Sequence, residues 1–318
     1  MRVQTLEYLK KINRLYITVD YHYTTKLQSE ILIKHESIET FNVQEFGMAR
    51  QSFAWGFKHS RFSLQVYLKM HSLLGIKQRI ALSKITGYYL WGSRSKPHQI
   101  PSEIHIDEYF CEGYGLYLAE GDTGMNGHHH PNKVRFTNND HSTLLFYLSW
   151  ITTLFPDTKI RSSCILPENT LTGRDLLSLP NMKLVKGKYN KKPKYRIAID
   201  SKIHIDLLLR LRTDVEDTVH TNISCAKAWV RGLFAGEGTV YNKKSKYVRI
   251  EMRNESIIQT ISNVFDRMNL KHRMYERSDR PGMWAIYIGV QSGLEQFRKE
   301  IGFGCHQGRQ QILDSIVV

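Results

Sequence analysis

The chain has 318 residues, with 45 Lys and Arg against 30 Asp and Glu, giving a formal net charge of +15. Hydrophobic residues make up 41% of the sequence, which is enough to build folded cores and excludes a chain that is disordered throughout. No apolar run approaches the ~18–20 residues that a membrane-spanning helix needs. The length predicts two or three domains.

The N-terminus and the cysteines favour a reducing compartment. Lys10, Lys11 and Arg14 interrupt the first apolar residues, so no secretory signal is expected. The four cysteines lie far apart without a CxxC pair, which excludes a common zinc-ribbon pattern and gives no disulfide framework. We therefore expect an intracellular protein, in the cytoplasm or nucleoid or in an organelle matrix, that is not secreted.

The excess of positive charge is the first indication of function. Residues 1–103 carry a net charge of +8, residues 104–218 carry +1 and residues 219–318 carry +6. Leu, Ile, Tyr and Phe run through all three segments, so the charge is expected on folded surfaces. Such a protein favours a polyanionic partner, either nucleic acid or an anionic membrane surface. Since no basic amphipathic helix stands out, nucleic acid is preferred and no membrane is expected.

Residues 1–103 are predicted to form an N-terminal domain of mixed structure. Residues 15–45, rich in Thr, Tyr and Ile, suggest strands whose places are not fixed. Helices are predicted over Phe62–Gly75 and, ending in glycine, over Lys77–Gly87. Short helices with a glycine turn, followed by the aromatic and basic run Tyr88–Lys96, are typical of a helix-turn-helix that contacts DNA. A small helical packing module explains the pattern equally well.

An internal repeat occupies the rest of the chain. Residues 113–121 read GYGLYLAEG and residues 230–238 read VRGLFAGEG, so both contain Gly-Leu-aromatic-x-x-Glu-Gly. Glu120 and Glu237 occupy matching places in the two copies. A repeat with matched flanks argues against the simpler interpretation, an ordinary pair of capped helices.

The two copies continue with the same order of predicted elements. In each, a strand, an amphipathic helix, a basic hairpin and a further helix follow the motif. In the first copy the strand is 134–142, the amphipathic helix Ser142–Phe155, the hairpin Lys159–Leu166 with Lys194–Ile199, and the further helix Ile203–Arg212. In the second copy they are 248–256, Ser256–Leu270, His272–Arg277 with Trp284–Val290, and Leu294–Ile301. The order predicts an α+β fold of two pseudo-symmetric αββαββα halves, residues 104–218 and 219–318.

Each repeated motif is predicted to be a helix with a face of small residues. Gly115 and Ala119 share one face of the first helix, and Gly232 and Gly236 share one face of the second. Small residues at these places would let the two helix backbones approach closely.

The ends of these two helices carry the predicted chemistry. Gly121 and Gly238 are expected to terminate them in a positive-φ conformation. Helices packed through their small faces would bring Glu120 and Glu237 side by side. Adjacent carboxylates repel each other unless a divalent cation lies between them.

The motifs, their spacing and the helix–hairpin order resemble the LAGLIDADG homing endonucleases, in their single-chain, two-motif form, over residues 104–318. The resemblance implies two halves whose antiparallel sheets form a saddle over double-stranded DNA. It also implies that Glu120 and Glu237 bind Mg²⁺ and support hydrolysis of DNA phosphodiesters, which two carboxylates holding divalent ions can do. The sequence departs from the family name, because both acids are Glu rather than Asp, and Leu118 and Ala235 replace the earlier Asp.

Further candidate catalytic residues lie at predicted strand ends. In this family a polar side chain often ends the second strand of each half, which indicates Asn138. Met252 stands at the matching place of the second copy, so the two halves are expected to differ in chemistry. Lys202, at the end of the last strand of the first half, is the candidate basic residue. A solvated strand-end side chain is the competing interpretation of each.

The predicted DNA-binding surface consists of basic residues on strands and loops. Alternate strand residues share a face, and Arg or Lys there can contact phosphates and guanine edges. His128, His129 and His130 are assigned to a DNA-facing loop rather than a zinc site, because three consecutive His cannot all face one ion. The basic candidates are Arg135, Lys194, Arg196, Lys243, Lys244, Lys246, Arg249, Arg273 and Arg277.

The sequence therefore predicts a monomeric, site-specific DNA endonuclease that makes a double-strand break at a long asymmetric target. It would use Mg²⁺, need no obligate protein partner and serve the homing of an intron or mobile element. The alternative is a catalytically silent nucleic-acid-binding protein of the same fold, such as an intron maturase or a DNA-binding regulator. Loss of a motif acid would favour that alternative, and both acids are present. The endonuclease part of an intein is disfavoured, because the chain shows no splicing residues at either end.

Overall fold

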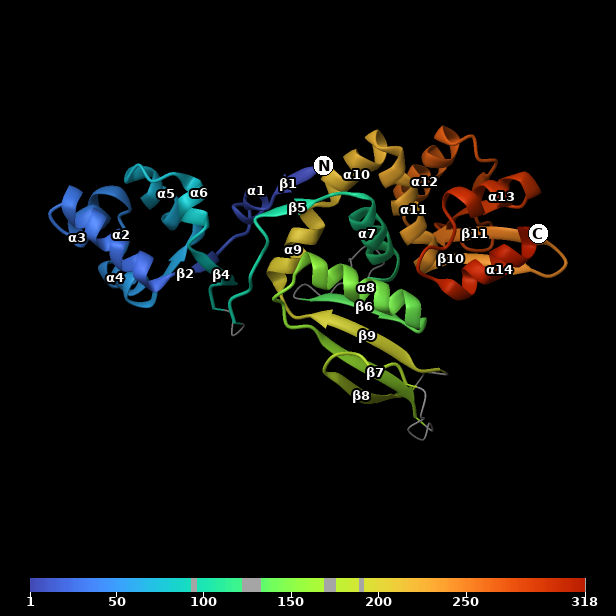
Figure 1. The fold of residues 1–318 in the computed structure, drawn as a ribbon, viewed down its shortest axis with the longest axis horizontal. Helices are drawn as coiled ribbons and strands as arrows, with labels where there is room; N and C mark the ends of the chain where they lie inside the picture. The colour runs from blue at the N-terminus through green and yellow to red at the C-terminus, as the bar shows by residue number, and fades with distance from the viewer. Residues whose placement is uncertain (93–95, 122–132, 169–175, 189–191, 318) are drawn as a thin grey trace. The chain divides into compact units, whose positions relative to one another are not determined.

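The computed structural model describes residues 1–92, 96–121, 133–168, 176–188 and 192–317. It confirms the predicted α+β class, with helices and strands throughout (Figure 1). The chain forms two compact units, one of residues 4–103 and one of residues 1–3 with 104–318, so both predicted halves lie in one unit. Across the described ranges, no helix combines the length and the apolar character that crossing a membrane requires.

The described residues of the N-terminal unit form six helices and a three-stranded antiparallel sheet in the order β3-β2-β4, and helices α4 and α5 contact the sheet. Leu15, Ile17 and Val19 of the central strand are buried, as expected where one face of a strand meets a core. Its elements are α1 (Leu6–Leu9), β2 (Leu15–Val19), α2 (Tyr21–Lys34), α3 (Ile38–Glu45), α4 (Arg50–His59), β3 (Arg61–Ser63), α5 (Leu64–Leu73), α6 (Gln78–Leu82) and β4 (Ile85–Leu90). Where the chain enters and leaves this unit, β1 (Arg2–Gln4) pairs with β5 (Glu103–His105).

The helix predicted over Phe62–Gly75 is confirmed as α5, whereas the helix predicted over Lys77–Gly87, and with it a helix-turn-helix that turns at Gly87, is wrong beyond Leu82. Helix α6 ends at Leu82, and the following residues form β4, in which Tyr88 and Tyr89 pair with Ile17 and Tyr16 of β2. Aromatic side chains fit a pleated, half-buried surface, so this segment is more stable as a strand than as a short helix. The strands expected over residues 15–45 are also wrong beyond Val19, because α2 and α3 fill the rest of that range.

The first half of the second unit holds a four-stranded sheet in the order β6-β9-β7-β8. The predicted basic hairpin corresponds to the antiparallel pair β7–β9, while β8, which was not predicted, pairs in parallel with β7. The elements are α7 (Glu108–Glu120), β6 (Val134–Asn138), α8 (His141–Leu154), β7 (Arg161–Pro167), β8 (Met182–Gly187), β9 (Lys194–Ile199), α9 (Lys202–Arg210) and α10 (Arg212–Thr221).

The second half holds a four-stranded sheet in the order β10-β11-β13-β12. The pairing of β11, β13 and β12 repeats that of β6, β9 and β7, and helix α14 at the C-terminal end was not predicted. The elements are α11 (Ile223–Glu237), β10 (Gly238–Asn242), β11 (Lys246–Met252), α12 (Glu255–Arg267), β12 (Arg273–Glu276), β13 (Trp284–Ile288), α13 (Gln291–Glu300) and α14 (Gln307–Val317).

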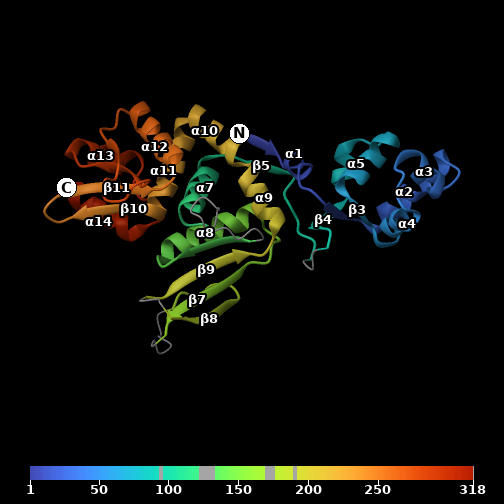
Figure 2. The same cartoon turned by 180° about the vertical axis from the view of Figure 1, so that it is seen from behind.

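Helices α7 and α11 pack against each other through their glycines, as predicted (Figures 1 and 2). A Cβ on Gly115 would overlap the backbone oxygen of Trp229, and one on Gly232 would overlap that of Glu112. The two backbones therefore touch directly, and any side chain at either glycine would push the helices apart.

The expectation of positive φ at the helix ends is wrong. Gly121 and Gly238 have φ of −83° and −68° and lie in extended conformations. Glycine is needed there for space: a Cβ on Gly121 would collide with Tyr117, and one on Gly238 with Phe234, both in the preceding helical turn.

Candidate active site and nucleic-acid interface

The last residues of α7 and α11 bring the two motif carboxylates to the same end of the helix pair. Glu120 packs against Gly236, whose Cβ, if present, would lie 3.1 Å from the Glu120 Cγ. Glu120 is half-buried, whereas Glu237 is exposed. The close approach of the backbones thus places two acidic side chains beside two negative helix ends.

The electrostatics of Glu120 reflect this crowding. Burial and the neighbouring Glu237 carboxylate raise the pKa of Glu120 to about 7, while Arg309 and Lys194 act in the opposite direction. Desolvation also raises the pKa of Glu237, again opposed by Arg309. The pair therefore carries less negative charge near neutral pH than two free carboxylates would.

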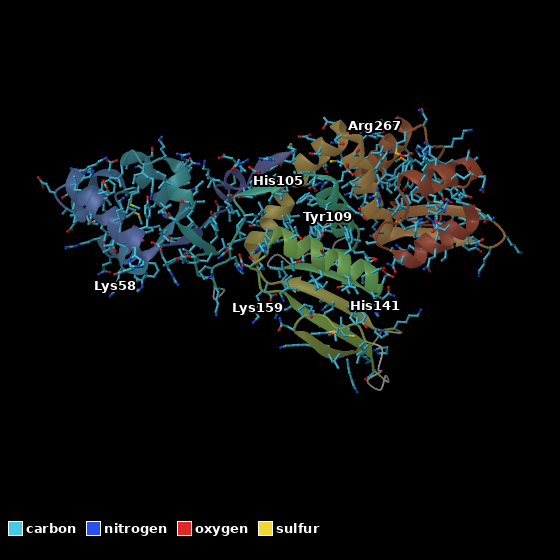
Figure 3. All side chains as sticks on the ribbon, viewed as in Figure 1. Lys58, His105, Tyr109, His141, Lys159 and Arg267 are labelled. Atoms are coloured by element: carbon cyan, nitrogen blue, oxygen red, sulfur yellow. The ribbon has the colours of Figure 1, made fainter. Side chains whose placement is uncertain are left out.

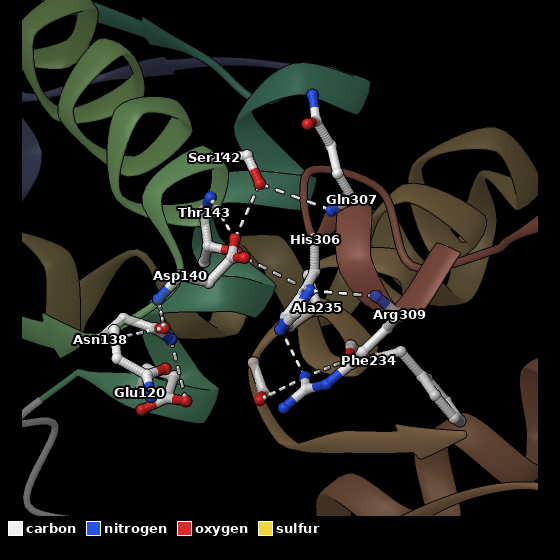
Figure 4. Close-up of polar contacts among 12 residues, drawn as sticks. Glu120, Asn138, Asp140, Ser142, Thr143, Phe234, Ala235, His306, Gln307 and Arg309 are labelled. Carbon is white, nitrogen blue, oxygen red and sulfur yellow. Dashed lines mark hydrogen bonds and ion pairs between the residues drawn. The ribbon is translucent and has the colours of Figure 1, made fainter. Parts of the chain in front are cut away.

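Asn138 contacts the first carboxylate. Its Nδ2 donates to Glu120 Oε1 at 3.1 Å (Figure 4). Its own carbonyl oxygen accepts from the backbone N–H of Asn139 at 2.7 Å and of Asp140 at 2.9 Å, which fixes the side chain. The sequence placed Asn138 at the site, and its geometry suits a residue that orients Glu120.

Lys202 does not lie at the site. Strand β9 runs antiparallel to β6, so Asn138 faces Tyr195 at the beginning of β9, and Val134 faces Ile199 at its end. Lys202 follows that far end and pairs with Asp206 at 3.1 Å. The error came from assuming that the last strand ends near the motif acid. Lys194, at the beginning of β9, is the lysine whose charge acts on Glu120.

Arg309, on helix α14, is the site residue that the sequence did not indicate. Its Nη1 donates to the carbonyl oxygens of Phe234 at 3.2 Å and of Ala235 and Gly236 at 2.7 Å (Figure 4). The guanidinium therefore caps the negative end of α11, a favourable place for a cation. It lies close enough to both motif carboxylates to act on their pKa values.

Helix α14 is anchored at the beginning of α8, in the other half. Asp140 accepts from the Thr143 N–H at 2.9 Å as the N-cap of α8, and its carboxylate lies 3.7 Å from His306 Nδ1 (Figure 4). The Gln307 N–H donates to Ser142 Oγ at 3.4 Å. The repeat recognised in the sequence ended at Ile301, and helix α14 was not predicted, so the sequence did not indicate Arg309.

The donor set at the helix ends suits a hard divalent cation. Carboxylate oxygens are ligands that Mg²⁺ prefers, and Mg²⁺ usually keeps water and substrate phosphate as its remaining ligands. Among the described residues, no group of three or more His, Cys, Asp or Glu could hold a metal, so a complete protein-built site is absent there. The histidines 128–130 lie outside the described residues.

One face of the first sheet is basic. Its side chains line a groove of about 460 Å³, and six of the eleven lining residues are Lys or Arg. Arg135 belongs to this groove, while Lys194 is exposed at the beginning of β9. Strand pairing aligns one row across all four strands, namely Thr137, Arg196, Ser163 and Lys183. Such a row can meet both phosphates and base edges.

The corresponding face of the second sheet is aromatic as well as basic. The rings of Tyr241 and Tyr247 lie 5.0 Å apart, and those of Tyr247 and Tyr287 lie 5.1 Å apart. One row across the four strands consists of Thr239, Arg249, Tyr287 and Arg273. The two sheets therefore offer different side chains to a ligand.

Ion pairs divide the basic candidates of the second half into two groups. Arg249 Nε lies 3.0 Å from Glu251, and Arg277 donates to Glu251 at 2.7 Å and to Asp279 at 2.9 Å, so these cations already contact acids. Arg273 is exposed on β12. Lys243, Lys244 and Lys246, in and beside the β10–β11 turn, are also exposed.

Comparisons with known proteins bear on the second half most directly. A family model described as a LAGLIDADG-like domain matches residues 224–302, which include Glu237 and most of α11 to α13. The resemblance predicted from the sequence is thereby confirmed for this stretch, which is similar to a LAGLIDADG-like domain. A search of curated proteins finds no match.

Solved structures with a similar fold include two kinds of protein. Mesophilic variants of the homing endonuclease I-DmoI share 15% identity with a TM-score of 0.43, over 62% of this chain and 96% of that chain. I-DmoI in complex with DNA and Mn gives 16% identity and 0.42, over 63% and 98%. Full-length DUF199/WhiA from Thermatoga maritima gives 14% identity and 0.42, over 67% and 62%.

Proposed function

We propose that the chain is a site-specific DNA endonuclease that acts as a monomer on one asymmetric target. The observation that carries the proposal is the placement of Glu120 and Glu237, the two repeated motif acids, at one end of a helix pair packed backbone to backbone. The family match on residues 224–302 includes the second of these acids. Cutting a long target in this way suits the homing of an intron or mobile element.

The chemistry would divide between the carboxylates and the groups around them. A divalent cation such as Mg²⁺, held by Glu120 and Glu237, would supply Lewis acidity and an activated water. Asn138 holds one oxygen of Glu120 in place through its amide. Lys194 and Arg309 add positive charge beside the carboxylates, which would also offset charge developing on a phosphate.

DNA would bind across the polar faces of the two sheets. The first face is a basic groove, and the second carries stacked tyrosines with Arg249 and Arg273. Because the faces differ, a target read by one chain would not be a palindrome. A single chain would supply both carboxylates and both faces, so no protein partner would be needed.

DNA binding without cleavage is the second candidate, and Arg309 favours it. Its guanidinium already occupies the carbonyls at the end of α11 and partly neutralises the motif carboxylates. A site with a built-in cation depends less on a metal ion than one without. In that case the protein would regulate or remodel nucleic acid by binding alone.

Cleavage selection from a randomised duplex DNA library in Mg²⁺, followed by assays on the selected site, tests the proposal. We expect double-strand cleavage by the wild type, loss of it in Glu120→Gln and in Glu237→Gln, and DNA affinities within a few-fold of wild type. Glu295→Gln, an exposed glutamate on α13, is the matched control. Full cleavage by both motif variants would overturn the assignment. Tight, sequence-specific binding without cleavage in Mg²⁺ or Mn²⁺ would establish the second candidate instead.

A further inference from the structure

The N-terminal unit has a surface pocket that the proposed cleavage chemistry does not use. Its volume is about 310 Å³, at the lower end of the range for small-molecule sites. Strands β2 and β3, helices α4 and α5, and Trp91, which directly follows β4, contribute to its walls. Tyr16, Trp55, Arg61 and Trp91 are among its twelve lining residues.

An unbroken series of aromatic rings crosses this pocket. The Trp91 ring lies 4.8 Å from that of Tyr16 and 5.7 Å, edge to face, from that of Trp55. Tyr16 is in turn 5.8 Å from Tyr89, over which the Arg61 guanidinium lies at 5.4 Å. Flat π-faces and a cation are thus assembled from four separate segments of the chain.

Trp91 is the exposed member of this series, whereas Tyr16 and Trp55 are half-buried and Tyr89 is buried. Trp91 is 51% exposed, although the unit buries other aromatic rings such as Phe41 and Tyr67 completely. A large aromatic ring left in water forgoes the stabilisation that burial would give it. An exposed aromatic cluster with a concave shape is therefore typical of a site that a ligand covers.

The charges around the pocket favour an anionic ligand with a flat apolar face. None of the twelve lining residues is acidic, and Arg61 is exposed at the rim. Lys58, on the same helix as Trp55 and labelled in Figure 3, is an exposed cation elsewhere on this unit's surface and is not one of the lining residues. The segment 1–103 as a whole carries a net charge of +8. A nucleobase on its phosphate backbone has both properties.

We propose that this pocket binds an unpaired base of single-stranded DNA, stacked on Trp91, with its phosphate backbone near Arg61 at the rim. In a duplex, neighbouring bases cover each base face, so only an unpaired base can present one to a ring. The stacking argument stands on the pocket alone. The choice of DNA over RNA rests on the proposed function.

Fluorescence anisotropy with the full-length protein and labelled oligothymidylate tests the site. Trp91→Ala should weaken binding by about 5- to 100-fold, the range expected for the loss of one base–aromatic stack, and Trp91→Phe should recover most of it. Tyr21→Ala, which removes another exposed ring of the same unit, should leave binding within twofold. Duplex affinity should not change in any of these variants.

Crosslinking and a comparison of DNA with RNA test the proposal further. An oligonucleotide with 5-bromodeoxyuridine should crosslink, under ultraviolet light, to a peptide that contains Trp55 or Trp91; adducts confined to residues 133–198 would overturn the site. Tighter binding of single-stranded RNA of the same sequence would overturn the assignment to DNA. Equal affinities of Trp91→Ala and wild type, with both folded by circular dichroism, would overturn the stacking. Failure of cleavage in Glu120→Gln bears only on the other site.

Discussion

Replacing Arg309 by methionine would show what holds the two motif carboxylates together. Methionine keeps a long apolar side chain but removes the donations from Nη1 to the carbonyls of Phe234, Ala235 and Gly236. It also removes the positive charge that acts on both carboxylates. The variant would leave two carboxylates and the negative end of α11 facing one another without that guanidinium.

The magnitude follows from these contacts. One guanidinium nitrogen has two protons, so the three carbonyls share about two strong hydrogen bonds. A hydrogen bond to a charged group contributes about 1.5–3 kcal/mol, and a cation at a helix C-terminus about 0.3–1 kcal/mol. Because Arg309 is only half-buried, water replaces part of what is lost. We expect the free energy of unfolding to fall by about 2–4 kcal/mol at pH 8.

Urea unfolding at two pH values, with and without Mn²⁺, measures this effect. At pH 5 the loss should be smaller, because Glu120, with its pKa raised to about 7, is protonated there and repels Glu237 less. At pH 8, Mn²⁺ should stabilise Arg309→Met more than wild type, since the cation would take the place of the missing charge.

A matched arginine on the neighbouring helix serves as the control. Arg298 pairs with Asp314 of α14 at the surface, and Arg298→Met should cost less than about 1 kcal/mol. Equal losses in the two variants would refute the reasoning, because α14 docking rather than the charge at the site would then explain them. So would a loss in Arg309→Met that is the same at pH 5 and pH 8.

Three further outcomes can be measured on the same protein. Without metal, the free energy of unfolding of wild type relative to Glu120→Gln should fall as the pH rises from about 5 to 8, because a carboxyl with a raised folded-state pKa stabilises the fold only while it is protonated. Over the same interval the affinity for Mn²⁺, measured by calorimetry, should rise as the proton leaves Glu120. Gly232→Ala should destabilise the fold by about 1–3 kcal/mol or more in thermal unfolding, whereas Gly308→Ala, where a Cβ would make only ordinary van der Waals contact with the His306 ring, should not. Replacing Arg196 by serine should lower the salt dependence of duplex binding by about one counterion, and an unchanged slope would remove Arg196 from the phosphate contacts.

The parts of the fold that the sequence predicted are those that repeat or alternate. Two copies of one motif, 117 residues apart, indicated the glycine-to-glycine packing of α7 and α11, because the spacing of Gly232 and Gly236 has meaning only on a helix. The alternation of residues along the chain predicted the paired strands of each half. The strand β4 was not, because a glycine before two tyrosines fits a turn after a helix as well as a strand, and only pairing with β2 decides between them.

The sequence predicted only those site residues that lie in or close to a recognisable sequence motif. Glu120 lies in a repeated motif, so alignment of the two copies indicated it, and the resemblance to the family indicated Asn138 at the end of the strand that follows. Lys202 was misplaced because strand direction, which decides which end of β9 lies near Glu120, depends on the sheet topology and not on the segment itself. Arg309 comes from a helix docked across the molecule, 72 residues beyond Glu237 in the sequence, and no local pattern reports such a contact.

The different neighbours of the two carboxylates have a kinetic consequence. Glu120 receives a hydrogen bond from Asn138, while the matching position of the second half is the buried Met252, which has no such donor. Glu237 instead lies at the end of the helix that Arg309 caps. A protein that cut both DNA strands with this pair would cut them at unequal rates, so a nicked duplex, always broken first on the same strand, would accumulate before the double-strand product.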